Sequence, residues 1–337
     1  MSKFASTLIA WQKRHGRRGL PWQGTRDPYK VWLAEVMLQQ TQVAEVIPYY
    51  ERFLKKYPTV TALAAASRDE VLQLWSGLGY YARARNLHAA AREIVEQDGF
   101  PDTLEGISGL PGVGRSTAAA IAAFAFGRRA AILDGNVKRV LARCYAIENE
   151  KEMWEKAESL LPAKDVETYT QALMDLGAAV CTRARPRCEL CPVQRECVAR
   201  SEGRVSELPA PRPRRRVPVR RSTWIVALHA NRILLERRPG AGIWGGLLSF
   251  PECDERNIAA YCRRALGCEI GASRKLPAVE HGFTHFRLHA VPVVCDVKSV
   301  LPRAEAGERL WVELAGAAAA AVPAPVRALL GRLAAAH

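Results

Sequence analysis

The chain has 337 residues, which is too long for one comfortable hydrophobic core and about right for two domains. Its formal net charge of +15 favours a polyanionic partner, most often a nucleic acid, although a basic proteome background is the alternative. We expect a folded cytoplasmic protein without a membrane span or export signal, because 49% of its residues are hydrophobic, no apolar run reaches 18 residues, and charges interrupt the first residues.

The predicted secondary-structure elements divide the chain into a helical part and a part with both strands and helices. Residues 1–200 predict helices joined by short turns, because apolar residues recur at helical spacing and Gly and Pro stand at the joints. The clearest helical segments are 27–57, 67–78, 82–97 and 115–127. A linker rich in proline and arginine follows at 201–221. Residues 222–337 then predict an α/β domain, with two strands around a tight turn in 222–238, a helix at 256–267, and strands at 286–297 and 309–314.

The stretch GLPGVGRST at 109–117 is one letter from a nucleotide-binding P-loop. No buried strand precedes it and it lacks the lysine, so ATP binding is disfavoured. The pattern instead predicts two short helices, within about 105–125, joined by a turn that contains Leu110, Gly112 and Gly114. Free N–H groups of such a turn can bind a phosphate, as in the helix-hairpin-helix of DNA repair proteins, which this stretch resembles. A plain helix–helix turn is the structural alternative.

Four cysteines lie close together, and their spacing is C-x6-C-x2-C-x5-C; they are Cys181, Cys188, Cys191 and Cys197. Four thiolates in one short segment need a cation, and general chemistry leaves zinc and an iron–sulfur cluster both open. The spacing resembles the [4Fe–4S] loop of the endonuclease III superfamily of DNA glycosylases. The other five cysteines show no metal spacing, and we expect them to be buried or free thiols.

Several further segments resemble the MutY-type adenine DNA glycosylases: LPWQ at 20–23, WLAEVMLQQTQV at 32–43, GLGYYARARNLH at 77–88 and LDGNVKRVLAR at 133–143. With the hairpin and the cysteine loop, the resemblance covers most of residues 8–200. It implies an all-helical catalytic domain that carries a [4Fe–4S] cluster at 181–197. It also implies a monomer that flips out and excises adenine mispaired with 8-oxoguanine or guanine in double-stranded DNA.

The resemblance implies a role for two carboxyl groups. Glu35 lies among apolar residues, which raise the pKa of a carboxyl group and suit it to act as a general acid for the leaving adenine. Asp134 would stabilise the cationic sugar, and it is also a good N-cap for the helix that follows. Ser116 stands where members with lyase activity carry a lysine nucleophile, so we expect a monofunctional glycosylase.

The resemblance also implies DNA-contact and pocket residues. Gln40 and Thr41 match positions near the orphaned base, and Tyr80 matches a residue that wedges into the base stack. The positions that match the adenine pocket are Arg18, Leu20, Trp22 and Asp175. Without the resemblance, helix-surface polarity and core packing are the favoured explanation for Gln40, Thr41 and Tyr80.

The second domain keeps part of a Nudix box. Gly246, Glu252 and Gly267 are in register, but Ala260, Tyr261, Arg264 and Ala265 replace the Arg-Glu and Glu-Glu pairs, so pyrophosphate hydrolysis is not expected. The domain therefore resembles the Nudix-like lesion-recognition domain of the same glycosylases. Its Phe-Ser-His loop corresponds to Phe283, Thr284 and His285, in which threonine replaces serine and adds a methyl group.

Three other functions compete with adenine excision. An oxidised-pyrimidine glycosylase with lyase activity is disfavoured by Ser116 and by the second domain. A catalytically silent iron–sulfur protein that binds DNA is disfavoured because Glu35 and Asp134 are both present. A nucleotide pyrophosphatase is disfavoured by the missing carboxylates.

Overall fold

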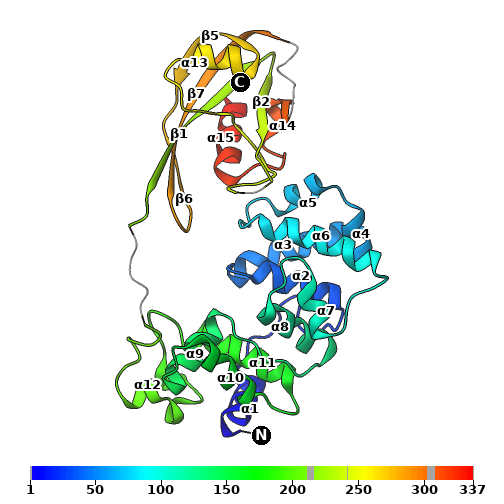
Figure 1. Ribbon diagram of the computed structural model, residues 1–337, viewed down its shortest axis with the longest axis vertical. Helices are drawn as coiled ribbons and strands as arrows, with labels where there is room; N and C mark the ends of the chain where they lie inside the picture. The colour runs from blue at the N-terminus through cyan, green and yellow to red at the C-terminus, as the bar shows by residue number, and fades with distance from the viewer. Residues whose placement is uncertain (1, 211–215, 241, 302–307, 337) are drawn as a thin grey trace. The chain divides into compact units, whose positions relative to one another are not determined.

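Residues 2–210, 216–240, 242–301 and 308–336 are described by the structure, a computed structural model (Figure 1). Backbone contacts divide the chain into two units. The first comprises Met1–Ala65 and Asn86–Pro213, and the second comprises Ala66–Arg85 and Arg214–His337. Residues 211–215, in the middle of the predicted linker, lie outside the described residues. No helix in the described ranges is long and apolar enough to cross a membrane.

The first unit is helical, as the periodicity of residues 1–200 predicts. Its α-helices are α1 (Lys3–His15), α2 (Pro28–Leu38), α3 (Val43–Lys56), α4 (Val60–Ala65), α6 (Ala82–Glu96), whose first turn belongs to the second unit, α7 (Leu104–Gly109), α8 (Arg115–Phe126), α9 (Gly135–Tyr145), α10 (Glu150–Leu160), α11 (Val166–Asp175) and α12 (Val198–Ser201). Shorter helical turns are η1 (Leu176–Val180), η2 (Cys188–Leu190) and η3 (Gln194–Glu196).

The long apolar pattern at 27–57 forms two helices rather than one. Asp27 caps α2 by accepting hydrogen bonds from the N–H groups of Tyr29 and Lys30, and Pro28 occupies the first helical position. Helix α2 ends where Gln40 adopts a left-handed backbone conformation with φ of 57°, and α3 begins at Val43. The break leaves the end of α2 next to the hairpin, where Gln39 Nε2 donates to the carbonyl oxygen of Gly112.

The predicted hairpin is present as α7, a tight turn and α8. Thr103 caps α7, and Gly127 ends α8 in the left-handed conformation. Gly112 has φ of +77°, and a Cβ atom at this position would lie 2.8 Å from Cβ of Asn86. Both the backbone conformation and the close approach therefore require glycine at 112.

We expect Gly112→Ala to lower the free energy of unfolding by about 1–3 kcal/mol, because it adds strain and a clash. Gly109→Ala is the matched control, since a Cβ atom there meets nothing within 4 Å and φ is not positive. Urea denaturation of both variants measures the difference. Equal midpoints for the two variants would show that the turn relaxes without cost.

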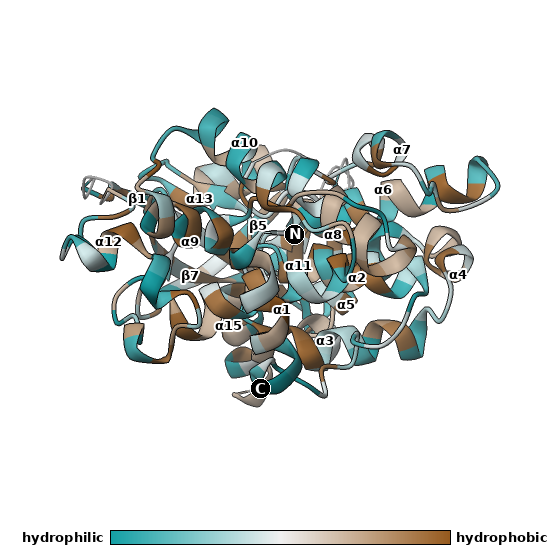
Figure 2. Ribbon diagram, turned by 90° about the horizontal axis from the view of Figure 1, so that it is seen from below, coloured by the Kyte–Doolittle hydropathy of each residue, from teal (hydrophilic) through white to brown (hydrophobic). Residues whose placement is uncertain are grey.

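The hydrophobic core of the first unit includes side chains of the first helix, α1, and contacts the cysteine loop. Buried side chains of α1, α8, α9 and α11 pack in one cluster, which the partly buried Cys181, Cys191 and Cys197 contact at its edge. Figure 2 shows that the helices carry both polar and apolar segments, as surface helices of a folded domain do. The cluster therefore ties α9 and α11 to the loop that holds the cysteines.

The second unit contains α5 (Arg68–Trp75) and a mixed α/β domain. The strands are β1 (Val219–His229), β2 (Arg232–Arg237), β3 (Leu248–Ser249), β4 (Glu252–Cys253), β5 (Cys268–Lys275), β6 (Val279–Gly282), β7 (Arg287–Val300) and β8 (Arg309–Glu313). Its other helical segments are α13 (Ile258–Tyr261), η4 (Cys262–Leu266), α14 (Leu314–Ala317) and α15 (Ala324–Ala335). Strand β1 begins at Val219, so the last three residues of the predicted linker segment are in the sheet.

The sheet follows the order β3-β2-β1-β7-β5, with β4 on β1, β6 on β7 and β8 on β2. Strands β1 and β7 are parallel and pair from Val219↔Arg287 to Leu228↔Asp296, whereas the other pairs are antiparallel. The predicted tight turn between β1 and β2 is confirmed: Ala230 and Asn231 both have positive φ. The predicted helix at 256–267 forms as α13 and η4, and Gly267 ends it with φ of +67°.

Candidate active site

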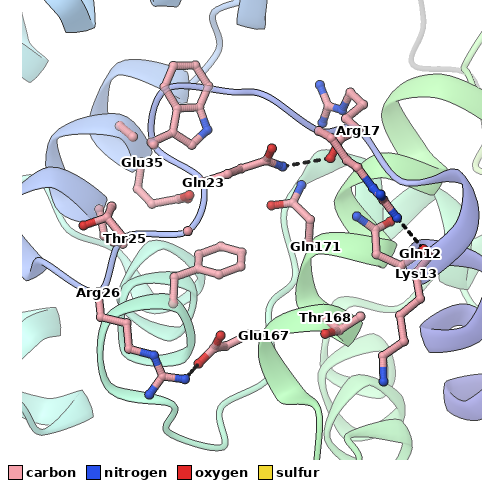
Figure 3. A pocket seen from close by; sticks show the side chains of 16 residues that line it. Gln12, Lys13, Arg17, Gln23, Thr25, Arg26, Glu35, Glu167, Thr168 and Gln171 are labelled. Atoms are coloured by element: carbon pink, nitrogen blue, oxygen red, sulfur yellow. Dashed lines mark hydrogen bonds and ion pairs between the residues drawn. The ribbon is translucent and has the colours of Figure 1, made fainter.

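A cavity of about 430 Å³ opens in the helical unit, within the size range of pockets for small ligands. Its walls come from the end of α1, the loop at 16–27, α2, Phe124 of α8, and α11 (Figure 3). Arg18 and Trp22, two of the residues that we expect at the adenine pocket, line this cavity, and so does Glu35. The wall from α11 includes Gln171, which sequence reasoning did not single out.

Glu35 is the only carboxyl group that α2 contributes to the cavity wall. The helix buries Trp32, Leu33 and Met37 completely, and Glu35 reaches the cavity instead. Burial, and secondly the negative charge of Asp134, raise the pKa of the Glu35 carboxyl group to about 8. Glu35 therefore retains a proton at neutral pH for most of the time, as its apolar neighbours in the sequence predict.

Asp134 is the N-cap of α9, which confirms the capping role that the sequence allows. Its Oδ1 accepts hydrogen bonds from the N–H groups of Asn136 at 3.0 Å and Val137 at 2.8 Å. Burial raises the pKa of Asp134, while these two N–H groups, the Asn136 side chain and the Arg139 charge oppose that rise. The helix terminus favours the ionised form, but it does not outweigh the desolvation of the carboxyl group.

A chain of polar contacts leads from Asp134 to the cysteine loop. Asn136 Nδ2 lies 3.4 Å from Asp134 Oδ2, and Arg139 donates to Asn136 Oδ1 at 2.8 Å. The same guanidinium donates to the carbonyl oxygens of Cys181 and Gly177, both at 2.7 Å. Sequence reasoning missed this link, although the spacing of Asn136 and Arg139 on one face of α9 is a signal that could have revealed it.

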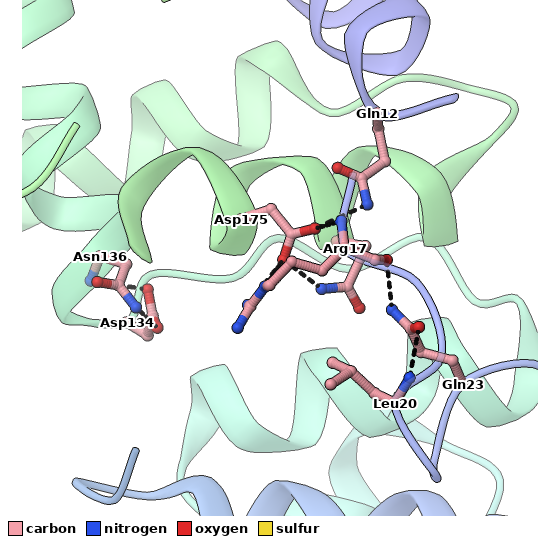
Figure 4. A network of polar contacts seen from close by, with 8 residues as sticks. Gln12, Arg17, Leu20, Gln23, Asp134, Asn136 and Asp175 are labelled. Atoms are coloured by element: carbon pink, nitrogen blue, oxygen red, sulfur yellow. Dashed lines mark hydrogen bonds and ion pairs between the residues drawn. The ribbon is translucent and has the colours of Figure 1, made fainter. Parts of the chain in front are cut away.

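Asp175 is not among the residues that line the cavity, and it stands in a network of polar contacts (Figure 4). Its carboxylate is 1% exposed and accepts hydrogen bonds from Gln12, Gln171 and both the backbone and the guanidinium of Arg17. Asp175 therefore connects α1 and α11 to the 16–27 loop. The backbone N–H of Leu20 donates to Gln23 Oε1 at 3.2 Å, in the same loop.

The hairpin candidates occupy different environments. The Leu110 side chain is buried, whereas Gly112 and Gly114 are exposed, with Gly114 at the N-terminus of α8. Ser116 Oγ accepts a hydrogen bond from the backbone N–H of Leu133 at 3.0 Å, which connects the hairpin to the residue before Asp134.

The remaining DNA-contact candidates belong to different units. Gln40 is exposed at the end of α2, and Thr41 Oγ1 donates to the Gln39 carbonyl oxygen at 3.4 Å. Tyr80 belongs to the second unit, where its ring is 47% exposed and lies beneath the guanidinium of Arg83 at 5.3 Å.

Cys181, Cys188, Cys191 and Cys197 all line one small second cavity, together with Cys144 and Arg143. Arg143 is 3% exposed and donates to the carbonyl oxygens of Thr182, Arg183 and Leu208. Its guanidinium also lies 3.3 Å from Cys181 Sγ. A buried cation thus faces the sulfur donors and offsets part of their charge when they are thiolates. Among the described residues, no three His, Cys, Asp or Glu side chains are arranged to hold a single metal ion.

In the second unit, the Phe283–His285 loop connects β6 to β7. The Phe283 ring stacks on Phe286 with centroids 4.4 Å apart, and Trp244 and His281 pack against Phe283. Thr284 and His285 are exposed beside this aromatic cluster. The rings hold the loop, and its two polar side chains face outward.

Glu252, the remaining carboxylate of the Nudix box, is bound by two arginines. Arg238 lies 2.6 Å from one carboxylate oxygen and Arg220 lies 3.2 Å from the other. Tyr261 Oη, at a position where the box carries an acid, donates to the Glu252 carbonyl oxygen. The chemistry of this site is that of an ion pair rather than of a magnesium centre.

Residues 33–163 match the HhH-GPD superfamily of base excision DNA repair proteins, and residues 223–332 match the NUDIX domain family. A thermostable thymine-DNA glycosylase structure aligns with a TM-score of 0.55 at 31% identity, over 59% of this chain and 95% of that one. An endonuclease III–DNA complex aligns with a TM-score of 0.52 at 23% identity, which shows the fold alone. These matches give the helical unit the fold of the HhH-GPD base excision DNA repair proteins.

The curated relatives narrow this class. Adenine DNA glycosylase of Buchnera aphidicola (subsp. Baizongia pistaciae) is 34% identical over 98% of this chain and 96% of its own length. The rat adenine DNA glycosylase is 37% identical over 86% of this chain and 69% of its own length. The chain belongs to the MutY-type adenine DNA glycosylase family, and it is an enzyme of base excision repair.

The raised pKa of Glu35 makes stability depend on pH. An unfolded chain loses the Glu35 proton near pH 4.5, whereas the folded protein keeps it to about pH 8. The free energy of unfolding therefore falls between these values, by at most about 1.4 kcal/mol per pH unit. Glu35→Gln lacks this loss, so its stability relative to the parent should rise from pH 5 to pH 8. Urea denaturation of both proteins across this range measures it, and a constant difference would contradict the raised pKa.

Proposed function

We propose that this enzyme is a monofunctional glycosylase that flips adenine out of double-stranded DNA and excises it where it is mispaired with 8-oxoguanine or guanine. The observation that carries the proposal is Glu35, which lines the cavity and whose pKa is raised to about 8 by burial and by the charge of Asp134. A monomer that acts on cytoplasmic DNA suffices for this activity, since one chain supplies every residue invoked.

In the proposed reaction, Glu35 donates its proton to a ring nitrogen of adenine, which then leaves as a neutral base. The sugar develops the positive charge of an oxocarbenium ion, and the Asp134 carboxylate stabilises that charge or forms a transient bond with it. Water completes the hydrolysis of the N-glycosidic bond. The protonated state of Glu35 and the N–H bonds to Asp134 Oδ1 support this division of roles.

The same residues argue against strand cleavage. A lyase forms a Schiff base between an amine and the sugar, and Ser116 has only a hydroxyl group, which already accepts a hydrogen bond from Leu133. We therefore expect the product to be an intact abasic strand.

Substitution of the two carboxyl groups distinguishes an enzyme from a protein that only binds DNA. Glu35→Gln removes the acid and Asp134→Asn removes the charge, so each variant should excise adenine at least about 100-fold more slowly in single-turnover assays. Asparagine also caps helices well, so Asp134→Asn should keep its stability, whereas Asp134→Ala should lose about 1 kcal/mol. Both amide variants should still bind DNA that contains an abasic site. Excision by folded Glu35→Gln at the parent rate would remove Glu35 from the mechanism.

We further propose that the four cysteines hold a [4Fe–4S] cluster. Four thiolates can hold either zinc or an iron–sulfur cluster. The four cysteines line one cavity, and their C-x6-C-x2-C-x5-C spacing, which resembles the [4Fe–4S] loop of the endonuclease III superfamily, supports the cluster over zinc. When bound, the cluster offsets the thiolate charges and crosslinks the loop, while Arg143 and Arg139 orient the backbone on either side.

Purified protein should therefore be brown and contain about four irons per chain. Cys188→Ser should lower the iron content and the visible absorption, whereas Cys144→Ser, at the thiol that shares the cavity without the motif spacing, should keep both. Stoichiometric zinc in protein expressed with ample iron would reject the assignment.

Recognition of 8-oxoguanine belongs, in this proposal, to the loop from Phe283 to His285. Thr284 and His285 are exposed polar groups on a rigid aromatic support, which suits them to hydrogen-bond a base. The Nudix box lacks the metal-binding acids, and its resemblance to the lesion-recognition domain of the same glycosylases supports recognition rather than hydrolysis.

Thr284→Val removes the hydroxyl group and keeps the shape. It should lower the ratio of excision rates opposite 8-oxoguanine and opposite guanine about fivefold, the value of one hydrogen bond. Thr284→Ser keeps the hydroxyl group and should retain the parent ratio. If Val and Ser behave alike in single-turnover assays, the Thr284 hydroxyl group does not recognise the lesion.

A further inference from the structure

The segment Ala66–Arg85 lies within the residues that match the glycosylase superfamily, yet its contacts group it with the Nudix-like domain. Its helix α5 starts with a capping box formed by Ser67 and Glu70. At that end, the Asp69 carboxylate forms a bidentate ion pair with Arg237 of β2, at 2.7 and 2.6 Å. A bidentate pair fixes orientation as well as distance.

Two further contacts flank the loop that carries Tyr80. Before the loop, Ser76 Oγ donates to the Val322 carbonyl oxygen at 2.6 Å, and Ser76 is only 4% exposed. After it, the Arg85 guanidinium donates to the Gly245 carbonyl oxygen at 2.7 Å. The Nudix-like domain thus supplies one acceptor at each end of residues 77–84.

The loop is strained but internally ordered. Gly77, Gly79 and Tyr80 all have positive φ, and tyrosine rarely adopts this conformation. Trp75 Nε1 donates to the Gly79 carbonyl oxygen at 3.0 Å, and the Gly77 N–H donates to Tyr81 Oη at 3.2 Å. A strained backbone persists only where its surroundings over-determine it.

We propose that the Nudix-like domain fixes the conformation of the Tyr80 loop, with Ser76 and Arg85 as the positioning residues. The domain then has a second role in addition to any contact between its own loop and a base. It presents the exposed ring of Tyr80 in one fixed orientation. For its effect on DNA, this inference rests on the proposed glycosylase function and on the wedge role of Tyr80 that the family resemblance implies, but the docking itself does not depend on that role.

Hydrogen exchange on the full-length protein tests the docking without DNA. Ser76→Ala removes one buried hydrogen bond, so the amides of residues 77–81 should exchange about fivefold faster, while those of α8 stay unchanged. Ser76→Thr keeps the hydroxyl group and should restore slow exchange. Ser159→Ala, which removes a serine–carbonyl bond in α10, is the matched control. If Ser76→Ala folds poorly, Asp69→Asn serves in its place, because it weakens the same docking by removing the charge from an exposed ion pair. Parent-like exchange at 77–81 in both Ser76→Ala and Asp69→Asn would overturn the proposal.

A double-mutant cycle with Tyr80→Ala tests the consequence for DNA. The measurement is the dissociation constant for a duplex with an abasic site opposite 8-oxoguanine. Ser76→Ala should weaken binding about threefold or more in the parent and have no effect in Tyr80→Ala, because it acts through that ring. Equal weakening in both backgrounds would overturn positioning through Tyr80. If Tyr80→Ala alone leaves binding unchanged, the wedge role fails, and the exchange result alone decides whether the domain fixes the loop.

Discussion

The site depends on two carboxyl groups that share one desolvated region but have different hydrogen-bond partners. Asp134 has the N–H groups of a helix terminus and a nearby guanidinium, whereas the influences on Glu35 are burial and the charge of Asp134. The charge of Asp134 therefore adds to the desolvation of Glu35 and keeps the proton there. One acid is neutral because the other is better stabilised as an anion, and this asymmetry requires α2 and α9 to be held firmly.

The helical unit holds them with buried polar groups. Helix α9 is connected through Arg139 and Arg143 to the backbone of the cysteine loop, so the cap at its first turn and the loop at its far end are parts of one bonded network. Asp175 does the same for the other wall by joining α1 and α11 to the 16–27 loop. Each of these groups would be costly to leave unpaired, which makes the cavity walls resistant to displacement.

The sequence pattern predicts those features of the fold that depend on residues close together in the sequence. The helices of the first unit, the turn at 110–114, the cap at Asp134 and the tight turn at Ala230–Asn231 follow from periodicity and from residues with special backbone preferences. The apolar pattern of 27–57 does not predict the split at Gln40, where the backbone is left-handed and the neighbouring Gln39 side chain contacts the distant Gly112. The position of Asp175 depends on partners more than 150 residues away in sequence, as does the docking of Asp69 on Arg237. The direction in which the pKa of Asp134 shifts depends on the balance of burial against hydrogen bonds, and only the folded structure reveals that balance.

Glu252 and its two arginines have a consequence for ion dependence. In a hydrolase of this fold the carboxylates of the box attract divalent cations, so activity follows the concentration of magnesium in the cell. Here a cation that approached Glu252 would have to displace Arg238 and Arg220 from its two oxygens and would find no second acid at positions 260, 261, 264 or 265. In this domain, two arginine side chains rather than a metal ion offset the negative charge of Glu252. The ion pairs at Glu252 therefore need no divalent cation to offset the charge of its carboxylate.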